Sequence, residues 1–312
     1  MTSISHHVPA GRLNALQPVL ARRSAILAAL RDWFGRAGFI EVETPIRLKI
    51  PALELHIDAE PSGDCYLRTS PELHMKRLLA AGFSRIYQIG PCFRRGERGD
   101  RHNPEYTMLE WYRTGCDYRA VLDDTREMVR HVARHVFGDP VIAHGGHRVN
   151  LESEWQEITV AEAFLRWAGW DPTTGYDEAR FEADLVQRVE PNLSVDHPVV
   201  LIDYPAPAAA LARLKPGNPA VAERWELYIG GLEIANAYSE LIDAAEQRRR
   251  FEQCADERRA MGKTVYPVDE DFLAALDNGM PPSAGIALGI DRLVMLFTGI
   301  ESLDDLLPFR DG

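Results

Sequence analysis

The sequence predicts an α+β domain in which helices pack around a sheet. Residues 106–112 alternate with the period of two that is typical of a strand with one face turned toward a site. A second stretch, residues 224–241, contains Gly230-Gly231, which suits the two-residue turn of a β-hairpin. Apolar residues at helical spacing mark the segments between the strands, at residues 19–37, 71–79, 117–140, 160–167 and 178–189 and from about 291 onward.

The length and composition fit one soluble enzyme domain. The 312 residues allow an ample core, and 46% hydrophobic and 26% charged residues are ordinary for a globular protein. We expect residues 1–17 to form a flexible lead-in and residues 18–312 to form a single domain. The net charge of -12 argues against unspecific binding of nucleic acid, so an anionic partner must meet a local basic patch.

No segment indicates export or membrane insertion. The first residues are polar and lack the apolar run of a secretory signal, and no apolar stretch is long enough to cross a bilayer. The four cysteines are scattered without a C-x-x-C pair, which predicts neither a zinc site nor a disulfide framework. The cytosol is therefore the expected compartment.

An arginine-rich loop precedes the first of these strands. Residues 93–112 read FRRGERGDRHNPEYTMLEWY, in which glycines interrupt the arginines and the strand then presents Tyr106, Glu110 and Tyr112. Arginines alone would fit a solvated surface hairpin. Together, a cationic loop and a strand with aromatic and acidic side chains favour a site for a phosphorylated, planar ligand beside a cationic one.

The residues TSPEL at 69–73 indicate the start of a helix. Ser70 suits the N-cap, and Pro71 suits the first helical position. Glu72 then falls in the first turn, where the helix dipole favours a carboxylate. That structural role explains Glu72 fully without a ligand.

The predicted hairpin carries several acids. With Gly230-Gly231 as the turn, Tyr228 faces Glu233 and Glu226 faces Ala235, which places Glu226 and Glu233 on one face. Two neighbouring carboxylates need a cation, either magnesium or a local arginine such as Arg224. Strict alternation places the remaining polar residues of the strand on the opposite face, so a single pocket requires a bulge near Ala235. These residues are Asn236, Tyr238 and Glu240.

A glycine-containing strand runs into a helix near the end of the chain. Residues 283–293 read SAGIALGIDRL, and a glycine within a strand often marks a close approach by a ligand or by backbone. Arg292 lies near the predicted helix start, where the dipole disfavours a cation. Its anionic partner could be Asp291 or a phosphate.

These segments resemble the catalytic core of class II aminoacyl-tRNA synthetases, and among them lysyl-tRNA synthetase. GFIEVETP at 38–45 is similar to motif 1, residues 93–112 are similar to motif 2, and GIALGIDRL at 285–293 is similar to motif 3. TSPELHMKRLL and GGLEIANAYSEL resemble the lysine-binding segments of that family. The resemblance extends from about residue 19 to the end. It implies a mainly antiparallel sheet flanked by helices, and a homodimer formed through motif 1.

One difference from lysyl-tRNA synthetase narrows the expected function. That enzyme carries an anticodon-binding domain before motif 1, where this chain has a short tail. The resemblance therefore implies a core-only relative that attaches (R)-β-lysine to a lysine of translation elongation factor P, with tRNA an unlikely partner. Ala287 stands where the synthetase has glycine, and Ser70 where it often has alanine. Such small changes reshape a pocket but discriminate only modestly.

The resemblance also implies roles for individual residues. Arg94 would bind the α-phosphate of ATP and the substrate carboxylate, and Arg292 would bind the γ-phosphate, which makes both catalytic. Magnesium would be held by Glu226 and Glu233. Further ATP contacts would come from Arg95, Gly96, His102, Asn103, Tyr106 (stacked on adenine), Glu233, Ile234 and Gly289. The amino acid would be surrounded by Ser70, Pro71, Glu72, Glu110, Tyr112, Asn236, Tyr238, Glu240 and Ala287.

Motif 2 departs from the family pattern at one position. The family has arginine and then, two residues later, glutamate, but here Gly96 occupies the glutamate position and Glu97 follows. Either Glu97 takes over this role or one nucleotide contact is lost.

The implied reaction has two steps. ATP activates the amino acid as an aminoacyl-adenylate with release of pyrophosphate, and the ε-amine of a protein lysine then displaces AMP to form an amide. One alternative is a truncated ligase that charges tRNA or another small amine. A second is a regulatory subunit without chemistry, which is disfavoured because the chain keeps the arginines and acids named above. The form of lysine used, the docking surface for the acceptor and the need for an aminomutase partner stay open.

Overall fold

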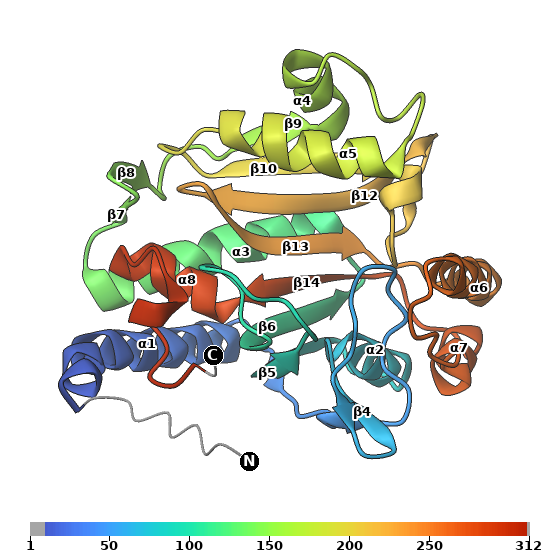
Figure 1. Ribbon diagram of the computed structural model, residues 1–312, viewed down its shortest axis with the longest axis horizontal. Coiled ribbons are helices and arrows are strands. Elements are labelled where there is room, and N and C mark those ends of the chain that lie inside the picture. The colour runs from blue at the N-terminus through green and yellow to red at the C-terminus, as the bar shows by residue number, and fades with distance from the viewer. Residues whose placement is uncertain (1–9, 311–312) are drawn as a thin grey trace.

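A nine-stranded sheet runs through the computed structural model, which describes residues 10–310 (Figure 1). The strand order is β1-β5-β6-β14-β13-β12-β10-β9, with β11 paired to β12. The β1–β5 and β9–β10 pairs are parallel and the others are antiparallel, so the predicted mainly antiparallel sheet is confirmed. Its strands are β1 (Ile40–Glu41), β5 (Arg85–Phe93), β6 (Glu105–Thr114), β9 (Gln156–Thr159), β10 (Val199–Pro205), β11 (Leu214–Lys215), β12 (Asn218–Ile229), β13 (Leu232–Ser239) and β14 (Ser283–Gly289).

Two small sheets and eight α-helices complete the described part of the chain. The small sheets comprise β2 (Arg47–Leu48), β3 (Pro61–Ser62) and β4 (Cys65–Leu67), and the pair β7 (Val141–His144) and β8 (His147–Asn150). The helices are α1 (Ala10–Arg36), α2 (Glu72–Ala80), α3 (Tyr118–Val132), α4 (Val160–Trp167), α5 (Glu178–Asp184), α6 (Ala244–Ala260), α7 (Glu270–Asp277) and α8 (Ile290–Thr298).

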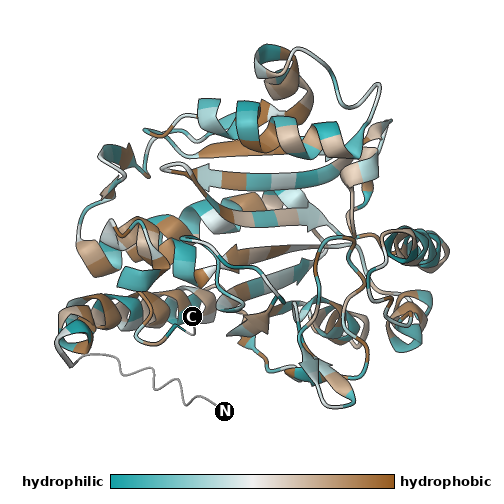
Figure 2. Ribbon diagram, viewed as in Figure 1, coloured by the Kyte–Doolittle hydropathy of each residue, from teal (hydrophilic) through white to brown (hydrophobic). Residues whose placement is uncertain are grey.

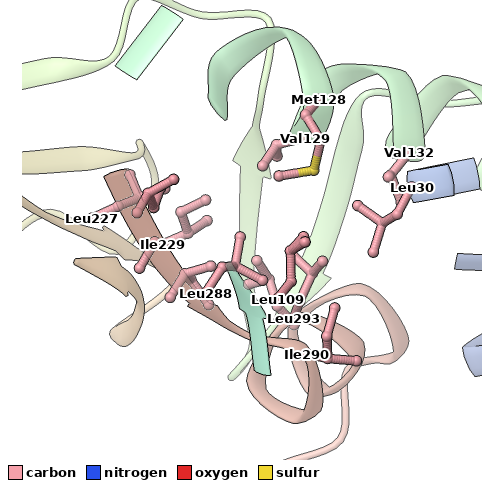
Figure 3. Close-up of a cluster of buried hydrophobic side chains, with 14 of the residues drawn as sticks. Leu30, Leu109, Met128, Val129, Val132, Leu227, Ile229, Leu288, Ile290 and Leu293 are labelled. Atoms are coloured by element: carbon pink, nitrogen blue, oxygen red, sulfur yellow. The ribbon is translucent and has the colours of Figure 1, made fainter. Parts of the chain in front are cut away.

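The main core lies between one face of the large sheet and helices α1, α3 and α8. Figure 3 shows strand residues such as Leu109, Leu227 and Leu288 gathered with Val129 of α3 and Leu293 of α8, all of them fully buried. Because side chains alternate along a strand, the residues between these apolar positions point to the opposite face. That opposite face carries the polar residues described below. By contrast, α6 is hydrophilic along most of its length (Figure 2).

Most predicted elements are confirmed. Helix α3 continues as a π-helical turn at Ala133–Phe137, and α5 continues as another at Leu185–Val189, which matches the predicted helices at 117–140 and 178–189. The strand predicted at 39–45 is much shorter, because only β1 pairs, and it lies at the sheet edge as Pro45 requires. None of the helices within residues 10–310 has the length and apolarity needed to cross a bilayer.

The predicted lead-in is partly wrong. Helix α1 already begins at Ala10, so residues 10–17 are helical, and residues 1–9 lie outside the described part of the chain. Tertiary contacts hold these first turns: Leu16 is buried, and Arg12 donates hydrogen bonds to the carbonyl oxygens of Asp304, Leu307 and Pro308. A local pattern of apolar residues could not show contacts with the other end of the chain.

Candidate active site

A row of paired residues crosses four strands on the sheet face opposite the main core. Glu110 of β6 pairs with Ala287 of β14, Ala287 pairs with Asn236 of β13, and Asn236 pairs with Glu226 of β12. Directly paired residues of neighbouring strands share a face. The fold therefore brings predicted site residues from three distant segments of the chain into one line.

The next row explains the strand glycine Gly285. It pairs with Tyr112 on one side and Tyr238 on the other. A Cβ atom at this position would lie 2.2 Å from the Tyr112 ring and 2.5 Å from Oε1 of Glu240, closer than real atoms approach. At Gly285 the close approach is therefore made by neighbouring side chains and not by a ligand or backbone as predicted, and glycine leaves the room for them.

A bulge in β13 makes a single pocket possible. Tyr228 pairs with Glu233, as predicted, but Leu227 pairs with Ala235, so Ile234 is an extra residue between the two pairs. The bulge predicted near Ala235 is confirmed. The predicted pairing of Glu226 with Ala235 is wrong, because the extra residue shifts Glu226 into register with Asn236.

A cavity of about 970 Å³ opens on this sheet face. Its wall joins the arginine-rich loop, the start of α2, strands β6, β12, β13 and β14, and the start of α8. Three predicted site residues are absent from this wall: Arg95 is exposed, Pro71 is buried at the start of α2, and Glu240 lies beneath the wall. The predicted residues that line the cavity are Ser70, Glu72, Arg94, Gly96, His102, Asn103, Tyr106, Glu110, Tyr112, Glu226, Glu233, Ile234, Asn236, Tyr238, Ala287, Gly289 and Arg292.

One end of the cavity is cationic. Arg292 donates hydrogen bonds from Nη1 to the Glu233 carboxylate at 3.0 Å and to the Glu233 carbonyl at 2.9 Å. Its Nη2 atom lies 2.7 Å from Nε2 of His102, which must accept because a guanidinium only donates. Burial and then the Arg292 charge lower the pKa of His102, which keeps the imidazole neutral for this contact.

Asp291 is not the partner of Arg292. Its carboxylate accepts hydrogen bonds from Nη1 of Arg23 at 2.6 Å and from the backbone N–H of Thr107 at 2.9 Å. Asp291 therefore points toward α1 and β6. The anionic partner that Arg292 needs near the start of a helix is Glu233.

Arg94, another arginine of the cavity wall, lies over an aromatic ring. Its guanidinium is 5.2 Å from the centre of the Tyr106 ring, and its Nη1 atom is 3.6 Å from the Glu97 carboxylate. Gly96 has a φ of +80°, in the region that favours glycine, and Glu97 also lines the cavity. Glu97 is thus the acid of this loop that lies beside Arg94.

The other end of the cavity is acidic and densely hydrogen-bonded. Glu110 accepts hydrogen bonds from Ser70 Oγ at 2.7 Å and from the Tyr112 hydroxyl at 2.8 Å. Tyr238 donates its hydroxyl hydrogen to Glu72 at 2.5 Å. Burial raises the pKa of Glu110 to about 7, with the nearby Glu72 carboxylate adding to the rise.

Lys76 also belongs to this acidic end, although the sequence did not predict it as a site residue. Its ammonium contacts the carboxylates of both Glu72 and Glu240, and the Lys76 side chain is fully buried. Burial raises the pKa of Glu240 against the opposing effect of the Lys76 charge. The i,i+4 spacing of Glu72 and Lys76 was a signal for their pair, but the contact with Glu240 depends on the fold.

The start of α2 differs by one position from the prediction. The helix begins at Glu72 with Pro71 as the N-cap residue, while Ser70 Oγ still accepts the Glu72 N–H at 2.9 Å. The Ser70 hydroxyl therefore serves both the helix start and Glu110.

Glu226 has the arginine partner that was the alternative to magnesium. It accepts hydrogen bonds from Arg224 at 2.7 Å, from the Tyr204 hydroxyl at 2.5 Å and from the Tyr228 hydroxyl at 2.8 Å. Both Glu226 and Glu233 nevertheless line the cavity, and carboxylate oxygens are ligands that magnesium accepts. The donor set fits the ion, and magnesium binding by this pair stays a prediction.

The fold and this site define a synthetase-type catalytic domain, and comparison with known families agrees. Residues 4–311 match the model of the class II tRNA synthetases for D, K and N. The chain belongs to this family.

Curated relatives fall into two groups. The lysine–tRNA ligase of Moorella thermoacetica is 37% identical over 94% of this chain, which spans 65% of that relative. The elongation factor P–(R)-β-lysine ligase of Erwinia tasmaniensis is 39% identical over 93% of this chain and is itself covered over 94% of its length. The ligase of the same name from Proteus mirabilis is 36% identical, with the same two coverages.

Proposed function

We propose that this protein uses ATP to activate (R)-β-lysine, or lysine, as an aminoacyl-adenylate and then transfers the aminoacyl group to the ε-amine of a lysine on translation elongation factor P. The products would be an amide, AMP and pyrophosphate. The main support is one cavity with two chemically distinct ends, a cationic end with Arg94 and Arg292 and an acidic end with Glu72 and Glu110. A triphosphate suits the first end, and a diamino acid suits the second.

The cationic end supports adenylate formation without a covalent enzyme intermediate. Arginines that neutralise phosphate charge accelerate such a reaction by positioning and by electrostatics. Tyr106, which lines the cavity beside Arg94, would stack on adenine in this proposal. Magnesium, held by Glu226 and Glu233, would add further neutralisation of the phosphates.

The acidic end supports a substrate with two amino groups. The two carboxylates of this end that line the cavity, Glu72 and Glu110, come from α2 and β6, so a ligand can meet acids on two different elements. Ala287 lies in the same row as Glu110 and Asn236 and also lines the cavity, so its methyl group takes up space that a glycine would leave open. We assign Ser70, Tyr112 and Tyr238 to the same binding site.

The share of each relative's length that this chain spans supports elongation factor P as the acceptor. The chain spans nearly the whole length of the elongation factor P ligases but about two thirds of the lysine–tRNA ligase. Identity is similar in both groups, which keeps charging of tRNA as the second candidate. We further infer that the protein acts in the cytoplasm, where its acceptor functions, and as a homodimer.

Pyrophosphate exchange tests the first step. Exchange should occur with (R)-β-lysine and be weaker with lysine and (S)-β-lysine. Labelled amino acid should then appear on elongation factor P and not on tRNA. Exchange with none of these amino acids would refute the enzyme proposal, and labelling of tRNA alone would select the second candidate.

A further inference from the structure

Glu54 is a carboxylate in the cavity wall that has no role in the function proposed so far. It lies in the segment between β2 and β3 and is partly buried. Among the contacts within residues 10–310, its carboxylate has one long hydrogen bond, from Thr69 Oγ1 at 3.5 Å, and no ion pair. The negative charge of a carboxylate in such surroundings costs free energy unless a cation pairs with it or a proton neutralises it.

Glu54 lies where the two ends of the cavity meet. Arg94 at the cationic end and then Glu72 at the acidic end are the charges that act on it most strongly. Thr69 connects Glu54 to the cationic end. Its carbonyl accepts a hydrogen bond from the Tyr106 hydroxyl at 3.0 Å, and the Tyr106 ring lies beside the Arg94 guanidinium. In an aminoacyl-adenylate, the acyl–phosphate bond is the junction between the amino acid and the nucleotide.

The segment that carries Glu54 is held in place by one cation on α6 and one just after that helix. Arg258 is fully buried and donates hydrogen bonds to the carbonyl oxygens of Glu54 at 2.6 Å, Leu55 at 3.2 Å and Ile57 at 3.0 Å. Lys263 donates to the Leu55 carbonyl as well, at 3.1 Å. A reactive group works best on a backbone that is fixed in this way.

We propose that Glu54 is the general base of the transfer step, an inference that rests on the function proposed above. One proton of the incoming ε-ammonium moves to the Glu54 carboxylate, and the nitrogen lone pair attacks the acyl carbon. The bond between that carbon and the phosphate oxygen breaks, and AMP leaves with its electron pair. The remaining excess proton on nitrogen and the proton on Glu54 pass to water, which restores the base.

The charge environment suits this task. Burial raises the pKa of Glu54 to about 6, although the Arg94 guanidinium opposes the rise. The carboxylate is therefore mostly ionised near neutral pH, while being a stronger base than an exposed glutamate. Other charged or titratable groups that face it are Glu72 on α2, Tyr106 on β6, Glu97 in the arginine-rich loop and Cys254 on α6.

The test compares two acceptors for one adenylate. Hydroxylamine is a largely neutral nucleophile at pH 7 and needs no base, whereas the lysine ammonium of elongation factor P does. The full chain is supplied with ATP, magnesium and (R)-β-lysine, and formation of the hydroxamate and of labelled elongation factor P are both measured. Glu54→Gln should keep pyrophosphate exchange and the hydroxamate rate within about twofold, but lose about 100-fold or more in transfer to the protein.

The pH profile distinguishes a base from a merely structural residue. Wild-type transfer should level off above about pH 7, since Glu54 is then ionised. The residual rate of Glu54→Gln should keep rising through pH 9, because it depends on acceptor amine that has already lost its proton. Glu54→Asp should recover part of the transfer rate, and the control Glu252→Gln, at an exposed position of α6 outside the cavity wall, should match wild type.

Each outcome decides between distinct explanations. Equal losses in hydroxamate formation and protein transfer would show that Glu54 serves substrate binding or activation, and would overturn the proposal. Normal transfer by Glu54→Gln would overturn it too. If wild type itself formed no hydroxamate, the proposed function would fail, and the role of Glu54 would fail with it.

Discussion

The Lys76 ammonium contacts the Glu240 carboxylate beneath the acidic end of the cavity, and both side chains are fully shielded from solvent. The same ammonium also contacts Glu72, while the nearby Glu110 forms no ion pair within the described residues 10–310. If all the acids are ionised, three carboxylates and one ammonium leave two negative charges unmatched. A diamino acid with two ammonium groups would balance them, which gives a physical reason for the predicted substrate class.

Lys76→Met should destabilise the free protein. Removing one partner of a buried ion pair leaves an uncompensated charge, at a cost of about 3–5 kcal/mol. Denaturant unfolding at pH 8 measures this loss. Glu240→Gln in the same chain should restore part of the stability, whereas additive losses in the double variant would show that the two groups do not act as a pair.

Glu110 should make the stability of the free protein depend on pH. Its folded-state pKa of about 7 is above that of an unfolded glutamate, so the folded state holds more protons between about pH 4.5 and 7. The free energy of unfolding should therefore fall across this range as pH rises, by about 3 kcal/mol.

The matched variant for this prediction is Glu110→Gln. It cannot titrate at this position, so its unfolding free energy should vary less between pH 5 and 7 than that of wild type. Parallel curves for the two proteins would contradict the raised pKa. Binding of an ammonium ligand beside Glu110 should release a proton, so wild-type affinity should rise with pH below about 7.

The hairpin shows how far local sequence rules reach. Its turn, the pairing of Tyr228 with Glu233 and the need for a bulge followed from glycine placement and period-two alternation. The pairing of Glu226 did not, because a bulge shifts every later pair by one residue and its position was known only approximately.

Contacts between distant segments were the harder part to predict. The position of Arg292 showed that it needs an anion, but only the fold determines that Glu233 and not Asp291 provides it. Glu54 gave no signal at all, since it lies in an irregular segment and its surroundings are assembled by Arg258. Periodicity identifies faces of strands and helices, but it does not identify partners for loop residues.

Gly285→Ala should disturb the acidic end. The added methyl group would overlap the Tyr112 ring and the Glu240 carboxylate, so we expect a loss of about 1–3 kcal/mol in stability and a higher KM for the amino acid. Backbone conformation is not the cause, because Gly285 is not among the glycines with positive φ.

Gly289→Ala is the matched control for stability. It lies on the same strand, but the nearest atoms to an added Cβ are those of Arg292 at 3.8 Å or more. Thermal unfolding should show a smaller loss for Gly289→Ala than for Gly285→Ala. Similar losses for both would indicate that alanine weakens β14 in general and that the close approach of Tyr112 is unimportant.

Replacing Arg292 should mainly lower activity, whereas replacing the adjacent residue Asp291 should mainly lower stability. Arg292 lies in the cavity wall and contacts Glu233 and His102, so Arg292→Ala should reduce pyrophosphate exchange by about 100-fold or more while the unfolding midpoint stays close to wild type. Asp291→Ala should instead cost about 3 kcal/mol, because it removes the ion-pair partner of Arg23, which keeps only its hydrogen bond to Thr107 Oγ1, and leaves the Thr107 N–H without an acceptor. Exchange kinetics and denaturant unfolding of the two variants separate these roles. If Arg292→Ala kept full exchange activity, the proposal that the cationic end binds the triphosphate of ATP would be wrong, because the γ-phosphate is assigned to the Arg292 guanidinium.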